Sequence, residues 1–142
     1  MSVFVVDASV VIKWFVPEVH SDAARRLLAY RHDYVAPDLL SAETANTIWK
    51  KVRRGELSPG NGERLVRDVD RVAVETVPCR ALAAEACALA IAVGHTVYDA
   101  MYLALAVRLD TRMITADESL AGALAAVPSL AAHIETVQRF KG

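Results

Sequence analysis

Cysteine is nearly absent from this chain, and the few cysteines present do not suggest a disulfide or metal framework. The 142 residues include only Cys79 and Cys87, which lack C-x-x-C spacing and have no histidine nearby at ligand spacing. Both lie in or beside an alanine-rich segment, so we expect two buried, reduced side chains. This pattern excludes a disulfide-rich secreted domain and favours a reducing cytoplasm as the compartment.

An excess of either charge is also missing, as is any long uninterrupted apolar run. The net charge is −1, so the whole molecule does not attract nucleic acid electrostatically. The longest apolar tract, Ala81–Val93, contains Glu85 and is too short to span a bilayer. The apolar run Val3–Val6 stops at Asp7 and follows no basic segment, which excludes a signal peptide. We therefore expect a soluble protein with no membrane contact.

What the sequence does contain is enough apolar surface for a packed core. Hydrophobic residues make up 54% of the chain and charged residues 23%, which excludes disorder. The length is usual for one domain, and no repeat, low-complexity segment or linker interrupts it. We therefore expect residues 1–142 to form a single domain.

Apolar periodicity predicts alternating strands and helices. Strands are expected at Val3–Val6, Tyr34–Ala36, Val74–Val77, Arg112–Thr115 and Ile134–Val137. Helices are expected at Ser9–Val16, from Ser21 to about Arg31, from an Asp38 cap to Arg54, at Arg64–Val72 with a weaker first turn from Ser58, at Ala81–Val93, from Thr96 to about Leu109, and at Glu118–Ala126. This alternation is typical of an α/β fold with a mostly parallel sheet.

Two aspartates follow predicted strands. Asp7 comes directly after Val3–Val6, and Asp117 comes two residues after Thr115. In open α/β sheets ligands bind beyond the carboxyl ends of strands, so these two acids can approach each other. Each also has a purely structural interpretation as the residue that caps a helix, and for Asp117 the two interpretations weigh about equally.

Two further acids, Glu43 and Asp99, lie on predicted helices, where each alone is most simply a boundary or first-turn residue. Together with Asp7 and Asp117 they favour a functional interpretation, provided that the four side chains converge in space. Carboxylates about 5 Å apart repel by roughly 3 kcal/mol per pair at an effective dielectric constant near 20. A domain stable by only about 5–15 kcal/mol could not hold six such pairs uncompensated. The cluster would have to bind protons or a hard cation such as Mg²⁺ or Mn²⁺.

Four segments, in order and at suitable spacing, resemble a PIN domain of the VapC toxin family: Phe4–Ser9, Ser41–Asn46, Val97–Ala106 and Met113–Glu118. The resemblance covers essentially the whole chain. It implies a three-layer α/β/α fold and a Mg²⁺- or Mn²⁺-dependent endoribonuclease. It also implies a cognate antitoxin and a homodimer as partners, with RNA as the substrate.

The same resemblance implies catalytic and metal-ligating roles for Asp7, Glu43, Asp99 and Asp117, of which Asp117 matches the most variable acid of the family. Ser9 and Thr115 match positions that often carry a hydroxyl near the site. We add Asn46, one turn beyond Glu43, as a third supporting residue. The scattered histidines are interpreted as non-catalytic: His20, His32, His95 and His133.

Three surface features have two interpretations each. The basic residues Lys50, Lys51, Arg53, Arg54, Arg64, Arg67 and Arg71 are either solvated helix faces or a rim that contacts RNA phosphates. Trp14 and Phe15 belong either to the core or to a groove for the antitoxin. The helix Ala81–Val93 has hardly any polar face, so it is buried either in the core or in a homodimer interface.

Other functions stay open at this point. A phosphoaspartyl phosphatase would use Asp7 as nucleophile but prefers a second acid where Ser9 stands, and a phospho-receiver domain needs a paired acid and a late lysine that are missing. A PIN nuclease of RNA processing without a toxin role, or a catalytically inactive module that binds nucleic acid or protein, also remains possible. Four intact acids argue against the inactive module.

Overall fold

A five-stranded parallel sheet forms the centre of the protein, which is described by a computed structural model over residues 2–142. The strand order is β3-β2-β1-β4-β5. The strands are β1 Val3–Val6, β2 Asp33–Pro37, β3 Val74–Val77, β4 Met113–Thr115 and β5 Ile134–Thr136. The predicted α/β fold is confirmed, and every strand pair in this sheet is parallel.

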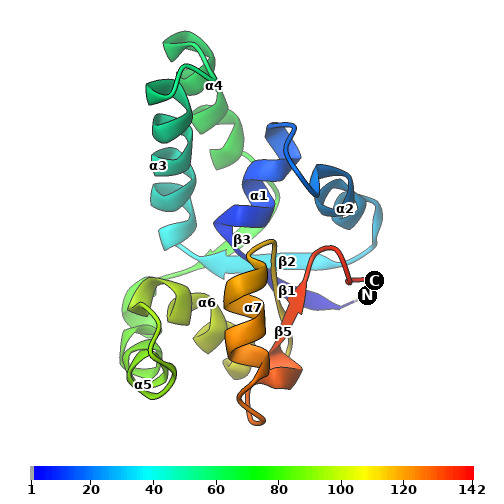
Figure 1. Cartoon of the computed structure of the whole chain (residues 1–142), viewed down its shortest axis with the longest axis vertical. Coiled ribbons are helices and arrows are strands. Elements are labelled where there is room, and N and C mark those ends of the chain that lie inside the picture. The colour runs from blue at the N-terminus through cyan, green and yellow to red at the C-terminus, as the bar shows by residue number, and fades with distance from the viewer. Residues whose placement is uncertain (1) are drawn as a thin grey trace.

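Helices cover both faces of this sheet (Figure 1). They are α1 Ala8–Phe15, α2 Ser21–Arg26, α3 Leu39–Arg53, α4 Pro59–Asp70, α5 Ala83–Val93, α6 Val97–Arg108 and α7 Glu118–Ala125, with 3-10 turns at Leu27–Ala29, Cys79–Ala81 and Ala131–His133. Helices α1 to α4 lie on one side, and α5 to α7 lie on the other. Helices α3 and α4 pack together as an arm that extends away from the sheet.

The order of the strands creates a switch point between β1 and β4. The chain first steps outward from β1 through β2 to β3, and then returns to place β4 on the other side of β1. Val5 of β1 is in register with Met113 of β4, and Val6 with Ile114. Since connections leave these two strands in opposite directions, a crevice opens beyond their carboxyl ends, the usual ligand site of such sheets.

Side-chain caps begin several helices where the sequence predicts them. Ser58 accepts a hydrogen bond from the amide of Asn61 at the start of α4, with Pro59 in the first turn. Thr96 caps α6 through the amide of Asp99. Asp38 also stands at a helix start, but its side chain does not cap α3. Its carboxylate instead accepts from the Cys79 amide at 3.0 Å, so the prediction of an Asp38 cap is wrong.

The second helix is shorter than its apolar spacing predicts. Helix α2 ends at Arg26 and continues only as the 3-10 turn Leu27–Ala29. The Leu27 carbonyl accepts from the amide of Tyr30 and, at 2.6 Å, from the hydroxyl of Tyr34 on β2. These bonds tighten the turn and lead the chain into the strand, which the spacing of apolar residues does not reveal.

The core is built mainly by β1, β4 and α6. In α6, residues 100–106 are all buried. Trp14 belongs to this core, and its indole nitrogen donates to the Ala24 carbonyl at 2.7 Å. Lys51 is also buried, in an ion pair with Glu18, which removes it from any exposed RNA-binding rim.

Helix α5 is not buried on all sides. Ala86 and Ala90 pack against the core, but Cys87, Ala88 and Ile91 face outward, with Ile91 80% exposed. The expectation of two buried cysteines is therefore wrong for Cys87, and Cys79 is only partly buried. Within residues 2–142 no single helix is long and apolar enough to cross a membrane; α5 and α6 reach such a length only together, with a 112° bend between them.

Candidate active site

Asp7 lies where β1 ends and α1 begins. Its backbone is still extended (φ −99°, ψ 175°), and its carboxylate accepts from the Val10 amide at 3.2 Å as the cap of α1. Because the buried strand fixes the backbone and the helix fixes one oxygen, the side chain has little freedom. Asp7 is only 7% exposed.

Two hydroxyl groups complete the surroundings of Asp7. Ser9 donates to Oδ1 at 2.5 Å, and Thr115 donates to Oδ2. The two hydroxyl oxygens are 3.3 Å apart. The amide of Ala116 donates to Ser9, and the amide of Asp117 donates to Thr115, at 3.0 and 3.1 Å. This hydrogen-bonded group ties the ends of β1 and β4 together across the switch point.

The surroundings of Asp7 perturb its ionisation. Burial raises the pKa of Asp7 from 3.8 to about 6, the hydrogen bonds from Ser9, Thr115 and Val10 partly oppose this rise, and the charge of Glu43 adds to it. The charged form is therefore held at neutral pH by hydrogen bonds against a cost of desolvation.

Glu43 projects from α3 toward the same crevice. Its Oε1 accepts a hydrogen bond of 2.6 Å from the hydroxyl of Tyr102, a side chain that is otherwise buried in α6. Burial raises the pKa of Glu43 and the charge of Asp99 raises it further, whereas the Tyr102 hydrogen bond lowers it. One carboxylate oxygen is thus fixed by tyrosine.

Asp99 and Asp117 make up the outer part of the group. Asp99 lies in the first turn of α6, where burial and the charge of Asp117 raise its pKa and the charge of His95 lowers it. Asp117 is exposed, and its Oδ1 accepts from the Leu120 amide at 3.0 Å as the cap of α7. Asp117 therefore both caps a helix and lies within electrostatic reach of Asp99.

The four acids thus form a row in which each influences the next, from Asp7 through Glu43 and Asp99 to Asp117. Asn46 does not join them: it is exposed on α3, and its side chain makes no hydrogen bond to these acids in residues 2–142.

Sequence reasoning did not find two residues near this row. Tyr102 was part of an apolar helix, and only its phenolic oxygen, which needs a partner when buried, could have signalled a polar contact. His95 is one of the four histidines that the sequence analysis interprets as non-catalytic. It lies directly before Thr96, the cap of α6, and its charge lowers the pKa of Asp99.

The donor chemistry of this row fits a hard divalent cation. The acids offer only oxygen atoms as ligands. Burial and mutual repulsion raise the pKa values of Asp7, Glu43 and Asp99, and a bound positive charge would stabilise their ionised forms. Within residues 2–142 no three histidine, cysteine, aspartate or glutamate side chains already stand close enough to hold a metal ion.

Comparison with known proteins agrees with this geometry. The PIN domain family matches residues 4–123. Ribonuclease VapC3 of Pyrobaculum aerophilum is 34% identical over 119 residues, which cover 82% of this chain and 91% of that protein. The chain belongs to the PIN-domain family, and within it to the VapC group. This membership separates it from the phosphatase and receiver-domain alternatives.

Solved structures share the fold of this PIN domain at low sequence identity. PAE2754 of Pyrobaculum aerophilum superposes with a TM-score of 0.67 at 22% identity, covering 95% of this chain and 83% of its own. VapBC2 of Rickettsia felis, bound to a DNA fragment from its promoter, gives 0.60 at 12% identity, with 94% and 98% covered. A toxin–antitoxin complex of Klebsiella pneumoniae gives 0.55 at 18% identity, with 96% and 98% covered. The three-layer PIN fold is therefore confirmed.

Proposed function

We propose that this protein, as one PIN domain over residues 1–142, is a divalent-cation-dependent endoribonuclease and the toxin of a toxin–antitoxin pair in the cytoplasm. The observation that carries the proposal is the row of four acids beyond the β1–β4 switch point, in a chain 34% identical to Ribonuclease VapC3. Two structural neighbours described as VapBC2 and as a toxin–antitoxin complex support a protein antitoxin as the partner.

Within this proposal Asp7 and Asp99 are direct ligands of Mg²⁺ or Mn²⁺, with Asp117 on the outer side. Such an ion supplies neutralisation of charge on the phosphate oxygens and on the leaving oxygen. Ser9 and Thr115 hold both oxygens of Asp7, so its orientation does not depend on the ion.

Glu43 is the candidate general base. Tyr102 holds its Oε1, which leaves Oε2 able to accept a proton from the attacking water. The raised pKa of Glu43 suits this role, because a base with a pKa nearer to the working pH accepts a proton more readily.

The test of this proposal is cleavage of single-stranded RNA by the purified protein. We expect internal cleavage with Mn²⁺ or Mg²⁺, none with EDTA, and no turnover of p-nitrophenyl phosphate. Cleavage that continues in EDTA, or that persists in Asp7→Asn, would contradict the site. Growth arrest that is relieved by the product of a short adjacent reading frame would separate a toxin from a PIN nuclease of RNA processing.

RNA phosphates would meet the exposed basic residues of the α3–α4 arm. Arg64 and Arg67 on α4 and Arg71 directly after it are exposed and make no ion pair in residues 2–142. Arg54, in contrast, pairs with Glu56, and Lys51 is buried. Arg53 is also exposed, with its guanidinium over the Trp49 ring. The rim proposed for RNA therefore consists of Lys50, Arg53, Arg64, Arg67 and Arg71. Changing Arg64 and Arg67 together to glutamine should weaken RNA binding more at low than at high salt.

A homodimer through α5 forms the last part of the proposal. Ala84, Ala88 and Ile91 make an exposed apolar stripe on this helix, which a second copy would cover. Because Ala88 is exposed, Ala88→Arg should give folded monomers, and Ala123→Arg on α7 should leave the dimer intact. Sedimentation that shows a stable monomer for the unmodified chain at micromolar concentration would end this part.

A further inference from the structure

One charged side chain of α3 is buried away from the row of acids. Lys51 is 5% exposed and belongs to the buried face of α3. Its Nζ pairs with the carboxylate of Glu18, which follows α1, and lies 3.9 Å from that of the exposed Glu56. Lys13 of α1 lies on the other side of Glu18, with its Nζ 3.3 Å from the carboxylate. We call Lys13, Glu18 and Lys51 the ionic cluster.

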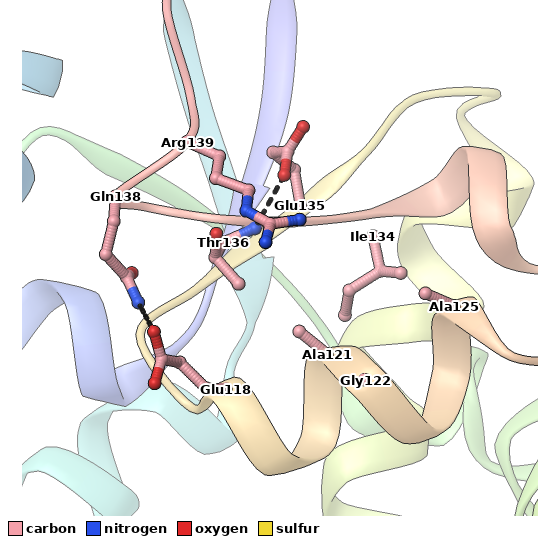
Figure 2. A pocket seen from close by; sticks show the side chains of 9 residues that line it. All are labelled: Glu118, Ala121, Gly122, Ala125, Ile134, Glu135, Thr136, Gln138 and Arg139. Carbon is pink, nitrogen blue, oxygen red and sulfur yellow. Dashed lines mark hydrogen bonds between the residues drawn. The ribbon is translucent and has the colours of Figure 1, made fainter.

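Burial separates the ionic cluster from side-chain pairs at the surface. Figure 2 shows one surface contact, from Gln138 to the exposed Glu118 beside the hollow between α7 and β5. Arg108 and Glu85 likewise pair while both are exposed. Exposed pairs contribute little to stability, whereas a buried lysine that loses its partner is strongly unfavourable. Removal of the Glu18 carboxylate would therefore force the Lys51 ammonium toward water.

The backbone that carries Glu18 is itself held in place. The amide of Glu18 donates to the Ser21 hydroxyl at 2.8 Å, and this hydroxyl donates to the Val16 carbonyl at 3.1 Å. The amide of Ser21 donates to the Glu18 carbonyl at 3.1 Å, and Ser21 is only 3% exposed. These bonds close the turn between α1 and α2, so the Glu18 carboxylate extends from a fixed segment.

The two helices that the ionic cluster joins each carry one acid of the candidate active site. Asp7 caps α1, and Glu43 lies in the second turn of α3. Apart from α4, α3 has its most extensive contact with α1, which lies between the α3–α4 arm and α2 (Figure 1). Lys51 follows Glu43 by eight residues, which is about 12 Å along the helix axis. The ionic cluster therefore joins α1 and α3 near the ends that are opposite to the acids.

The remaining contacts of α3 define its direction less well. β2 runs into its first turn through Asp38, and Tyr102 holds Glu43, whereas α4 packs along α3 but belongs to the same arm. Apolar packing against α1 is non-directional and allows the two helices to slide. The ionic cluster has a direction and a defined length, and it acts far along α3 from the Tyr102 contact. These two points of attachment together prevent α3 from pivoting about either one.

We propose that Glu18 is a positioning residue: through Lys51 it holds α3 against α1 and so determines where the Glu43 carboxylate stands relative to the attacking water. The inference rests on the proposed ribonuclease function, in which Glu43 is the general base. A displacement of about 1 Å at a catalytic group lowers a rate by up to about 10²-fold. The proposed metal ligand Asp7 keeps its hydrogen bonds from Ser9 and Thr115 when the ionic cluster is lost, so metal binding is retained.

The test compares Glu18→Gln with the matched control Glu56→Gln. Both variants remove a carboxylate that faces Lys51, but the exposed Glu56 is the more distant partner. At a temperature where each variant is fully folded, kcat for RNA cleavage should fall by on the order of 10- to 100-fold in Glu18→Gln and should not change in Glu56→Gln. KM and the Mn²⁺ concentration for half-maximal rate should stay within about threefold of the unmodified protein, because the ligands of the ion do not move.

A shorter acid keeps the test decisive if Glu18→Gln does not fold. Glu18→Asp retains the negative charge beside Lys51 and withdraws it by one methylene group. We expect a folded protein whose kcat falls by about 3- to 10-fold with KM unchanged. An unchanged kcat in this variant and in Glu18→Gln would overturn the proposal.

A double-mutant cycle separates positioning from general destabilisation. If Glu18 acts through Glu43, Glu18→Gln should lower the residual cleavage of Glu43→Gln by less than about threefold, since the group that it positions is already gone. A residue with only a structural role would lower cleavage by the same factor in both backgrounds. Equal factors would therefore overturn the proposal.

Hydrogen exchange measured by mass spectrometry tests the same link without activity. In Glu18→Gln the amides of residues 39–48 should exchange faster than in the unmodified protein, while those of β1, β4 and α6 should not change. Unchanged exchange in α3, or an equal increase in all elements, would contradict the proposal. Failure of the ribonuclease function has a different signature: the unmodified protein then cleaves no RNA with Mn²⁺ or Mg²⁺, but the faster exchange of α3 in Glu18→Gln remains.

Discussion

Asp7 and Asp117 are the same residue type at corresponding places, yet the fold treats them differently. Both follow strands that meet at the switch point, and both cap the helix that comes next. Asp7 is buried and accepts from Ser9, Thr115 and Val10, whereas Asp117 is exposed and accepts from one amide. The difference arises because Asp7 directly follows β1, while Ala116 separates Asp117 from β4. Burial and the number of donors, more than the residue type, therefore determine how strongly each acid depends on a cation.

The largest expected contrast is in catalysis. Asp7→Asn should lower RNA cleavage by on the order of 10³-fold or more, because it removes the negative charge of a proposed direct metal ligand. Asp117→Asn should lower cleavage by only about tenfold, since this exposed side chain lies on the outer side of the site and the amide still caps α7. Initial rates at saturating Mn²⁺ measure both. Equal losses in the two variants would mean that the inner and outer acids do not differ as the structure indicates.

The next contrast is in stability without metal. Because the pKa of Asp7 is raised from 3.8 to about 6, the folded state binds this proton more tightly than the unfolded state. The resulting stability is present below pH 4 and is lost as the pH rises through about 6, a loss of about 3 kcal/mol. The raised pKa values of Glu43 and Asp99 act in the same direction.

Urea unfolding of the protein in EDTA between pH 4 and pH 8 measures this loss. Asp7→Asn should show a shallower decline and should be at least as stable as the unmodified protein at pH 8. A variant whose stability declines as steeply as that of the unmodified protein would show that the desolvated Asp7 carboxylate is not the cause.

The sequence reveals the inner half of the site better than the outer surface. Asp7 follows the apolar strand β1, and Thr115 ends β4, its neighbour in the sheet. Both can be predicted from the sequence, because ligand sites of α/β folds lie at the carboxyl ends of the strands. The ion-pair partners of Lys51 and the exposure of one side of α5 cannot be predicted in this way. The spacing of apolar residues along a helix shows that the helix has an apolar face, but not which residues cover that face. The contact from Tyr102 to Glu43 joins residues 59 positions apart, a pairing that only the packed helices α3 and α6 create.

Metal binding should also distinguish Asp7 from Asp117, through a smaller difference in stability. Mn²⁺ at about 100 times its dissociation constant would stabilise the folded protein by about 2.7 kcal/mol. For a chain of this size we expect the melting temperature to rise by about 5–10 °C at pH 7. Asp7→Asn should lose most of this rise and Asp117→Asn only part of it. Differential scanning fluorimetry with Mn²⁺ titrated from EDTA makes the measurement, and an identical rise in all three proteins would place the ion away from Asp7.

The smallest expected effect concerns Tyr102, which holds Glu43 as Ser9 and Thr115 hold Asp7. Tyr102→Phe removes the 2.6 Å hydrogen bond without opening a cavity, because the ring stays in the core. One hydrogen bond to a charged group is worth about 1.5–3 kcal/mol, and Glu43 is only half-buried, so cleavage should fall by about 3- to 30-fold. Loss of the donor also raises the pKa of Glu43 further, which should move the acid limb of the pH–rate profile upward. Tyr98→Phe, at a 61% exposed position on the same helix, should change neither quantity. A rate that falls in Tyr102→Phe with no movement of the acid limb would assign Tyr102 a packing role instead of the positioning of Glu43.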